Sequence, residues 1–91
     1  MQSAAPLAIY GRAAVTATAG AITATATKLN NGVTVKALAG NTQKCYVGDS
    51  GVTTANGFEL SPGQEHLFRV VDASTLFVVG TASDNVCFEA S

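Results

Sequence analysis

The stretch AVTATAGAITATATKL, residues 14–29, decides the fold class. Small apolar residues alternate with threonine on both sides of Gly20. A period of two residues is the pattern of a half-buried strand, and β-branched threonine suits a pleated surface. We therefore expect strands before and after Gly20, with another layer packed closely on the thin alanine face. The apolar positions are Val15, Ala17 and Ala19 before Gly20, and Ile22, Ala24 and Ala26 after it.

The rest of the chain continues as short apolar runs separated by turn residues. No window carries a sustained helical stripe with caps. The sequence predicts an all-β fold, a single small β-sandwich or barrel of about seven or eight short strands over residues 13–91. Residues 1–12 are expected to form an extended arm or an edge strand. Further strands are expected from Val33 toward Gly40 and over residues 44–48, 65–72, 74–82 and 85–90.

Two turns have clear sequence signals. Asn31-Gly32 is a turn pair because both residues tolerate positive φ. Residues 61–64 read SPGQ and fit a type II turn, in which Pro62 presets φ and Gly63 takes positive φ. A third, short turn around residues 72–74 is expected to join the strands over 65–72 and 74–82.

The tetrapeptide Gly48-Asp49-Ser50-Gly51 matches the nucleophile loop of chymotrypsin-like serine proteases. A serine nucleophile needs a base and a group that orients the base. The only histidine, His66, follows Ser50, whereas in those proteases the histidine comes first. We therefore interpret GDSG as a turn in which Asp49 and Ser50 bond nearby backbone and the glycines allow positive φ.

The composition points to binding and away from catalysis. Charged residues make up 12% of the chain and the net charge is −1, whereas soluble domains usually carry about 25% charged residues. Much of the surface is expected to contact another protein; the alternative is a small neutral domain kept soluble by Thr, Ser and Asn. Without a basic patch, nucleic-acid binding is not expected. No apolar run approaches a membrane span, and the start does not resemble a signal peptide, so synthesis in the cytoplasm is expected.

No enzyme, cofactor or metal site is predicted. Two cysteines and one histidine are too few for a metal framework, and no phosphate-binding glycine motif is present. A lone histidine before an apolar strand is more often a surface or strand-edge residue than a ligand. In a cytoplasmic protein Cys45 and Cys87 are expected to be reduced, and whether they touch stays open.

Residues 35–83 resemble small structural proteins of tailed bacteriophages. The recognisable pieces are the turn Gly40-Asn41-Thr42, then YVGDSGVTTANGFELSPG over 46–63, then a hairpin VVDASTLFVVG over 70–80. The resemblance implies a capsid cement (decoration) protein that binds the major capsid protein lattice and stabilises the mature head. The alternative is a head-fibre, tail or receptor-binding β module. A cement protein implies the virion surface as its location, and symmetric placement implies a homo-oligomer, a dimer or trimer.

The first ten residues suit a partner-contacting arm. Pro6 favours an extended backbone, and Leu7, Ile9 and Tyr10 supply apolar anchors. The alternative is that this segment forms the first edge strand of the chain's own sheet.

Overall fold

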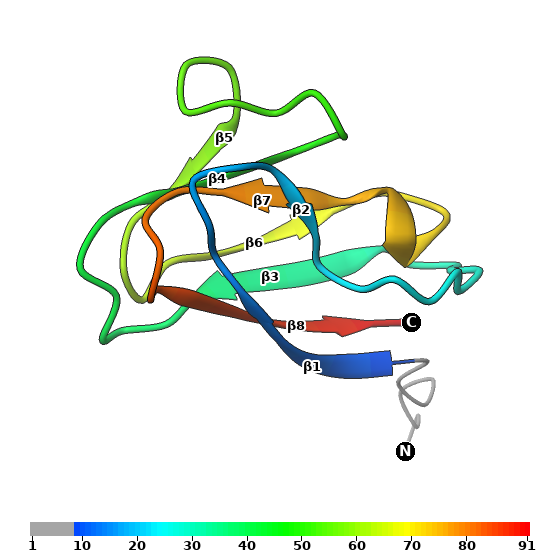
Figure 1. Cartoon of the computed structure of the whole chain (residues 1–91). Helices are drawn as coiled ribbons and strands as arrows, with labels where there is room; N and C mark the ends of the chain where they lie inside the picture. The colour runs from blue at the N-terminus through cyan, green and yellow to red at the C-terminus, as the bar shows by residue number, and fades with distance from the viewer. Residues whose placement is uncertain (1–8) are drawn as a thin grey trace.

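Eight short strands form two four-stranded antiparallel sheets that pack as a sandwich, in a computed structural model that describes residues 9–91 (Figure 1). Sheet A has the strand order β1-β8-β3-β6 and sheet B the order β2-β7-β4-β5. The predicted all-β sandwich is confirmed, and the barrel alternative is excluded. The strands are β1 (Ile9–Ala14), β2 (Gly20–Ala21), β3 (Val33–Ala37), β4 (Cys45–Gly48), β5 (Phe58–Leu60), β6 (Glu65–Phe68), β7 (Phe77–Val79) and β8 (Asn85–Ala90), with one 3-10 turn, η1 (Ala73–Thr75).

The core lies between the two sheets and is built by alternation along the strands. In β3, Val33, Val35 and Ala37 are fully buried, while Lys36 faces solvent. Each fully buried valine or leucine contributes roughly 1.5–3 kcal/mol relative to exposure. The largest fully buried side chains are Leu60, Val15, Val33, Val35, Val47, Val78, Val86 and Cys45.

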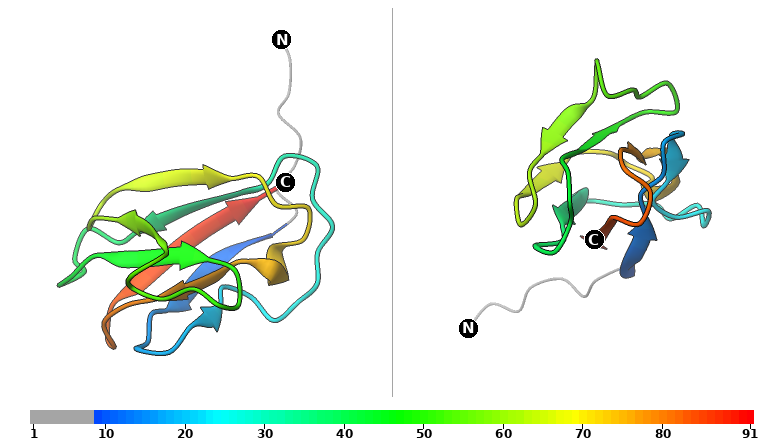
Figure 2. Two further views of the ribbon diagram at one scale, coloured as in Figure 1. Left: turned by 90° about the horizontal axis from the view of Figure 1, so that it is seen from above. Right: turned by 60° about the vertical axis from the view of Figure 1, so that its left-hand side comes forward.

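The threonine- and alanine-rich stretch departs from the expected pattern. Only Gly20–Ala21 forms a strand between β1 and β3, so the prediction of one strand before Gly20 and another after it is wrong. Its buried anchors are Val15, Ile22 and Leu29, spaced seven residues apart. An alanine methyl gains little free energy on burial, so alternating alanines alone do not hold a strand in a sheet. From β2 to β3 the chain instead runs around one end of the sandwich (Figure 2).

Hydrogen bonds tie this connection to the sandwich at several points, two of them at its buried anchors. The Ile22 N–H donates to the Leu76 carbonyl (3.0 Å), and the Leu29 N–H donates to the Val71 carbonyl (2.8 Å). Each bond fixes the backbone at or beside a buried anchor. The large apolar residues and these bonds, not a period of two, therefore set the course of the segment.

The expected hairpin around residues 70–80 is also wrong. β6 belongs to sheet A and β7 to sheet B, so the connection between them crosses from one layer to the other. The Asp72 carboxylate accepts the N–H groups of Ser74 (2.9 Å) and Thr27 (3.1 Å), and it caps η1. These bonds hold the pKa of Asp72 below its ordinary value, with the Ser74 N–H as the main cause. A capped 3-10 turn redirects the chain where a tight hairpin turn would have paired the strands.

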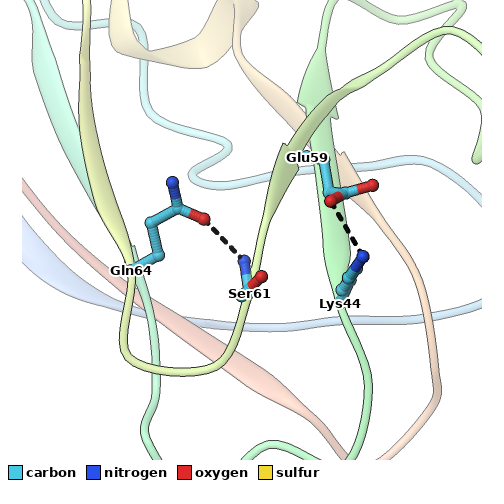
Figure 3. A network of polar contacts seen from close by, with 4 residues as sticks. All are labelled: Lys44, Glu59, Ser61 and Gln64. Atoms are coloured by element: carbon cyan, nitrogen blue, oxygen red, sulfur yellow. Dashed lines mark hydrogen bonds and ion pairs between the residues drawn. The ribbon is translucent and has the colours of Figure 1, made fainter.

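The two glycines with the clearest turn signals do adopt positive φ. Gly32 has φ +104°, and a Cβ there would collide with the carbonyl oxygen of Phe68. Gly63 has φ +85°, and the Gln64 N–H donates to the Ser61 carbonyl at 2.8 Å, as in a type II turn with Pro62 at its second position. The Gln64 side chain also accepts the Ser61 N–H at 2.9 Å (Figure 3).

Asn31 does not share the positive φ of its neighbour. Among the non-glycine residues of 9–91, only Ser83 has a positive φ, at 81°. Asn31 instead donates its backbone N–H to the Ser91 carbonyl and its side-chain amide to the Ser91 hydroxyl (3.2 Å). The turn before β3 is therefore fastened to the residue after β8.

Candidate interaction surfaces

The GDSG tetrapeptide forms a tight turn after β4. Asp49 Oδ1 accepts the Gly51 N–H (2.9 Å), and the Val52 N–H donates to the Asp49 carbonyl (3.0 Å). Ser50 is exposed in this turn. The expected positive φ at Gly48 and Gly51 is absent; Gly48 is instead favoured because a Cβ would lie 2.9 Å from Val52 Cγ2.

His66 packs in an aromatic cluster at the side of the sandwich. Its ring stacks on Phe58 at a centroid distance of 4.2 Å and meets the edge of Phe68 at 4.9 Å. Phe58 lies on β5 and the other two rings on β6, which are end strands of the two sheets. Within residues 9–91 no hydrogen bond links Ser50 to His66, so the described contacts of His66 serve packing between the sheets.

Asp84 is the buried polar residue among residues 9–91, and no sequence motif marks it. It is 3% exposed, and its carboxylate accepts the N–H groups of Thr42 (2.9 Å) and Gln43 (3.1 Å) and the Thr42 hydroxyl (3.1 Å). These bonds, led by that of the Thr42 N–H, lower the pKa of Asp84. Beside it, the Asn41 side chain exchanges two bonds with the Asn85 backbone (2.9 and 2.8 Å), as a neighbouring strand would. The 40–43 turn is thus fixed to the start of β8.

The two cysteines are free thiols in different environments. Cys45 is buried in the core on β4, whereas Cys87 is half-buried on β8 of the other sheet. Burial, with a smaller effect of the Asp84 carboxylate, raises the pKa of the Cys45 thiol to about 11. Cys45 therefore stays protonated and inert at neutral pH, and Cys87 is the thiol placed toward the surface.

The outer face of sheet A carries the most distinctive set of exposed side chains. Register and alternation place eight outward residues in two rows that cross all four strands. The same eight residues line a depression of about 530 Å³ and a smaller one beside it. In the strand order β1, β8, β3, β6, row one is Tyr10, Glu89, Thr34 and Leu67, and row two is Arg12, Cys87, Lys36 and Glu65.

The charges on this face balance. Two are positive, on Arg12 and Lys36, and two are negative, on Glu65 and Glu89. Within the part of the chain that the structure describes, the only ion pair lies elsewhere, between Lys44 Nζ and Glu59 Oε2 at 3.0 Å (Figure 3). The four charges of the outer face are therefore not paired with one another in the single chain.

The opposite side of the sandwich is partly covered by its own chain. Val78 on β7 points into the core, so the next residue, Val79, points to the outer face of sheet B. The Val79 side chain is nevertheless only 4% exposed. The depression beside it is lined by residues 17–19 and 50–54. The loop between β4 and β5, which contains the second of these segments, projects from the sandwich (Figure 1). Sheet A is therefore the sheet with the more open outer face among the described residues.

A second open surface is the Ala/Thr segment, residues 13–27. It contains no charged side chain, and most of its residues are exposed. Val15 and Ile22 anchor it in the core. The segment thus presents small uncharged groups to solvent from a backbone fixed at defined points.

The predicted partner-contacting arm divides between two regions. Pro6 and Leu7 lie outside the described residues. Ile9 and Tyr10 belong to β1, which pairs with β8 as an end strand of sheet A. Ile9 packs against the core, while Tyr10 is 75% exposed on the outer face. Residues 9–12 thus form an edge strand of the chain's own sheet.

Comparison with known proteins gave no match to a family model, to a curated protein or to a solved structure. No helix among residues 9–91 is long and apolar enough to cross a membrane. Over the same residues, no three His, Cys, Asp or Glu side chains are grouped so that they could hold a metal ion.

Proposed function

We propose that this chain is a structural protein of a bacteriophage virion, a capsid cement protein that binds the lattice of the major capsid protein and stabilises the mature head. The observation that carries the proposal is the Ala/Thr segment, an exposed and uncharged surface held on a small sandwich. The resemblance of residues 35–83 to small phage structural proteins supports the same function. The protein would be made in the host cytoplasm and would act on the capsid surface.

The chemistry of the Ala/Thr segment suits contact with a large protein wall. Burial of an alanine side chain loses almost no rotamer entropy, and there is no charge to strip of water. Threonine hydroxyls can donate or accept hydrogen bonds across the contact. Modest contacts of this kind suffice when each is repeated at many lattice positions.

The mechanism is stabilisation by mass action. A protein that binds the assembled lattice and not the separate subunits stabilises the lattice by RT ln(1 + [L]/Kd) per site. At a free concentration of about 100 Kd this amounts to about 2.7 kcal/mol per site. Summed over a shell, this would help an expanded head resist the pressure of packaged DNA.

The test uses purified heads that lack this chain, to which the full protein is added back. Binding should follow a saturating curve, and saturated heads should burst at a higher temperature. Ala24→Glu places a charge in the Ala/Thr segment and should weaken binding at least tenfold. Ala55→Glu adds the same charge at an exposed position in the loop between β4 and β5 and should bind like wild type. Unchanged bursting of saturated heads, or equal effects of the two variants, would contradict the proposal.

One observation favours a second function, a head-fibre, tail or receptor-binding module. Tyr10 is 75% exposed beside the depression of about 530 Å³ on sheet A, as a stacking platform for a sugar ring would be. A glycan array with the isolated chain would separate this function from the first. Specific glycan binding that Tyr10→Ala abolishes would favour the receptor-binding module.

A further inference from the structure

We propose that the outer face of sheet A is the binding surface for a second copy of this chain, related by a two-fold axis that runs parallel to the strands between β8 and β3. This inference goes beyond the proposed function, because the pairing of two copies requires no viral shell. It is carried by the order of side chains in the two rows of that face. A two-fold interface must be complementary to itself, and this one can be checked residue by residue.

The proposed axis reverses the strand order of the partner without shifting the rows. β1 of one copy then faces β6 of the other, and β8 faces β3. In row two, Arg12 of one copy meets Glu65 of the other, and the same contact occurs again on the far side of the axis. In row one, Tyr10 meets Leu67 in the same manner. The dimer therefore contains two Arg12–Glu65 ion pairs and two Tyr10–Leu67 contacts.

The remaining positions are also compatible. Glu89 faces Thr34, whose hydroxyl can donate to the carboxylate, and Cys87 faces Lys36. No like charges meet directly. The alternative face-to-face axis, perpendicular to the strands, would place Leu67 opposite Glu65. It would bury a leucine against a carboxylate and leave both Arg12–Glu65 pairs unmade, so the parallel axis is favoured.

The exposed apolar side chains of Tyr10 and Leu67 support the binding of another molecule to this face. Tyr10 is 75% exposed and Leu67 41% exposed, and they lie at opposite ends of row one. The face is about 19 Å wide, from four strands about 4.8 Å apart, and about 20 Å long, from strands of six residues. A face of this size gives a flat contact of about 380 Å² per copy, which is smaller than a standard specific interface, so we expect a weak dimer with a dissociation constant of tens to hundreds of micromolar.

The central experiment is a charge exchange between Arg12 and Glu65, measured by analytical ultracentrifugation of the full chain over a micromolar concentration series. Arg12→Glu creates two Glu-Glu contacts per dimer, and Glu65→Arg creates two Arg-Arg contacts. Each single change should weaken dimerisation at least tenfold. The double variant R12E/E65R remakes both ion pairs with opposite polarity and should restore the dissociation constant to within about threefold of wild type.

The charge exchange distinguishes a contact between two copies from a contact within one copy. Arg12 and Glu65 lie on the two end strands of sheet A, separated by three strand spacings, about 14 Å, within one chain. Both side chains are exposed, so each variant should keep the wild-type far-ultraviolet circular dichroism and unfolding temperature at concentrations where the protein is monomeric. Rescue by the double variant then reports a contact between two molecules.

Cross-linking through Cys87 tests the position of the proposed axis independently. It lies on β8, next to the proposed axis, so the two Cys87 thiols of a dimer come close together, whereas Cys45 is buried. A short bismaleimide should cross-link the wild-type dimer through Cys87, and Cys87→Ser should abolish the product. The R12E variant should cross-link less, and R12E/E65R should cross-link like wild type.

Three results would overturn the inference. The first is a monomer at every concentration tested. The second is a dimer that the single charge reversals leave unchanged, which would place the interface elsewhere, for example on the free edge of β1. The third is a failure of R12E/E65R to recover dimerisation although it folds. None of these results depends on heads, so the dimer and the cement function can fail separately.

Discussion

Truncation of Leu60 is the most direct test of whether the core between the two sheets provides the free energy of folding. Leu60 is fully buried on β5, opposite Cys45 on β4. Leu60→Ala removes the largest fully buried side chain and leaves a cavity, for which the loss is about 2–5 kcal/mol. Because β5 is a three-residue end strand that can relax, we expect about 3 kcal/mol.

That loss is large for a chain of 91 residues. Domains of this size have an unfolding free energy of about 5–14 kcal/mol. At about 4–8 °C per kcal/mol, the unfolding temperature should fall by about 12–24 °C. The assay is urea and thermal unfolding followed by circular dichroism, at a concentration where the protein is monomeric and with the m-value checked against wild type.

Leu67→Ala is the matched control, since it makes the same chemical change on β6 at a side chain that is 41% exposed. It should lower the unfolding free energy of the monomer by less than about 1 kcal/mol. Equal losses for the two variants, or a loss below about 1 kcal/mol for Leu60→Ala, would refute the assignment of the core between these sheets.

Three further outcomes follow from the turns, the buried carboxylate and the thiols. Gly32→Ala should destabilise the fold by about 1–3 kcal/mol, because φ is +104° and a Cβ has no room, whereas Gly40→Ala, with open space around it, should be nearly neutral in the same unfolding assay. The pKa of Asp84 is lowered in the folded state, so its stabilising effect is complete above the ordinary carboxyl range and is lost as pH falls through the folded pKa. Asp84→Asn should therefore lower the unfolding temperature at neutral pH and flatten its fall in acid, and an unchanged pH profile would show that the bonds to the 42–43 backbone are unimportant. In a thiol titration of native protein at neutral pH, Cys87 should react and Cys45, with a pKa of about 11, should react only after unfolding; two fast thiols would contradict the burial of Cys45.

The two surfaces have different relations to the sequence. The Ala/Thr segment is visible in the sequence as an uncharged run, although its prediction as paired strands was wrong. The outer face of sheet A could not be seen there, because its eight residues come from four strands between positions 10 and 89. The β1-β8-β3-β6 order alone brings Tyr10 into a row with Leu67.

The sequence by itself determined the fold class and the elements with strong local signals. Valine-rich alternation predicted the strand that begins at Val33, and turn residues around apolar runs predicted β4 and β8 close to their observed bounds. Gly63 adopts the positive φ that its place after Pro62 predicted. These signals work because β-branched side chains and backbone constraints act over a few residues.

Only the tertiary structure decided which strands pair and which apolar residues are buried in the core. Alanine alternation between Val15 and Leu29 could not form strands, since a methyl group gains too little on burial to hold an edge. Where a hairpin was expected, the chain crosses between the sheets at Asp72, whose carboxylate also accepts the N–H of Thr27, 45 positions away in the sequence. Burial of Asp84 likewise depends on the backbone at 42–43, brought to it by the fold. Long-range contacts of this kind are set by the packing of the whole sandwich, which no local stretch of the chain contains.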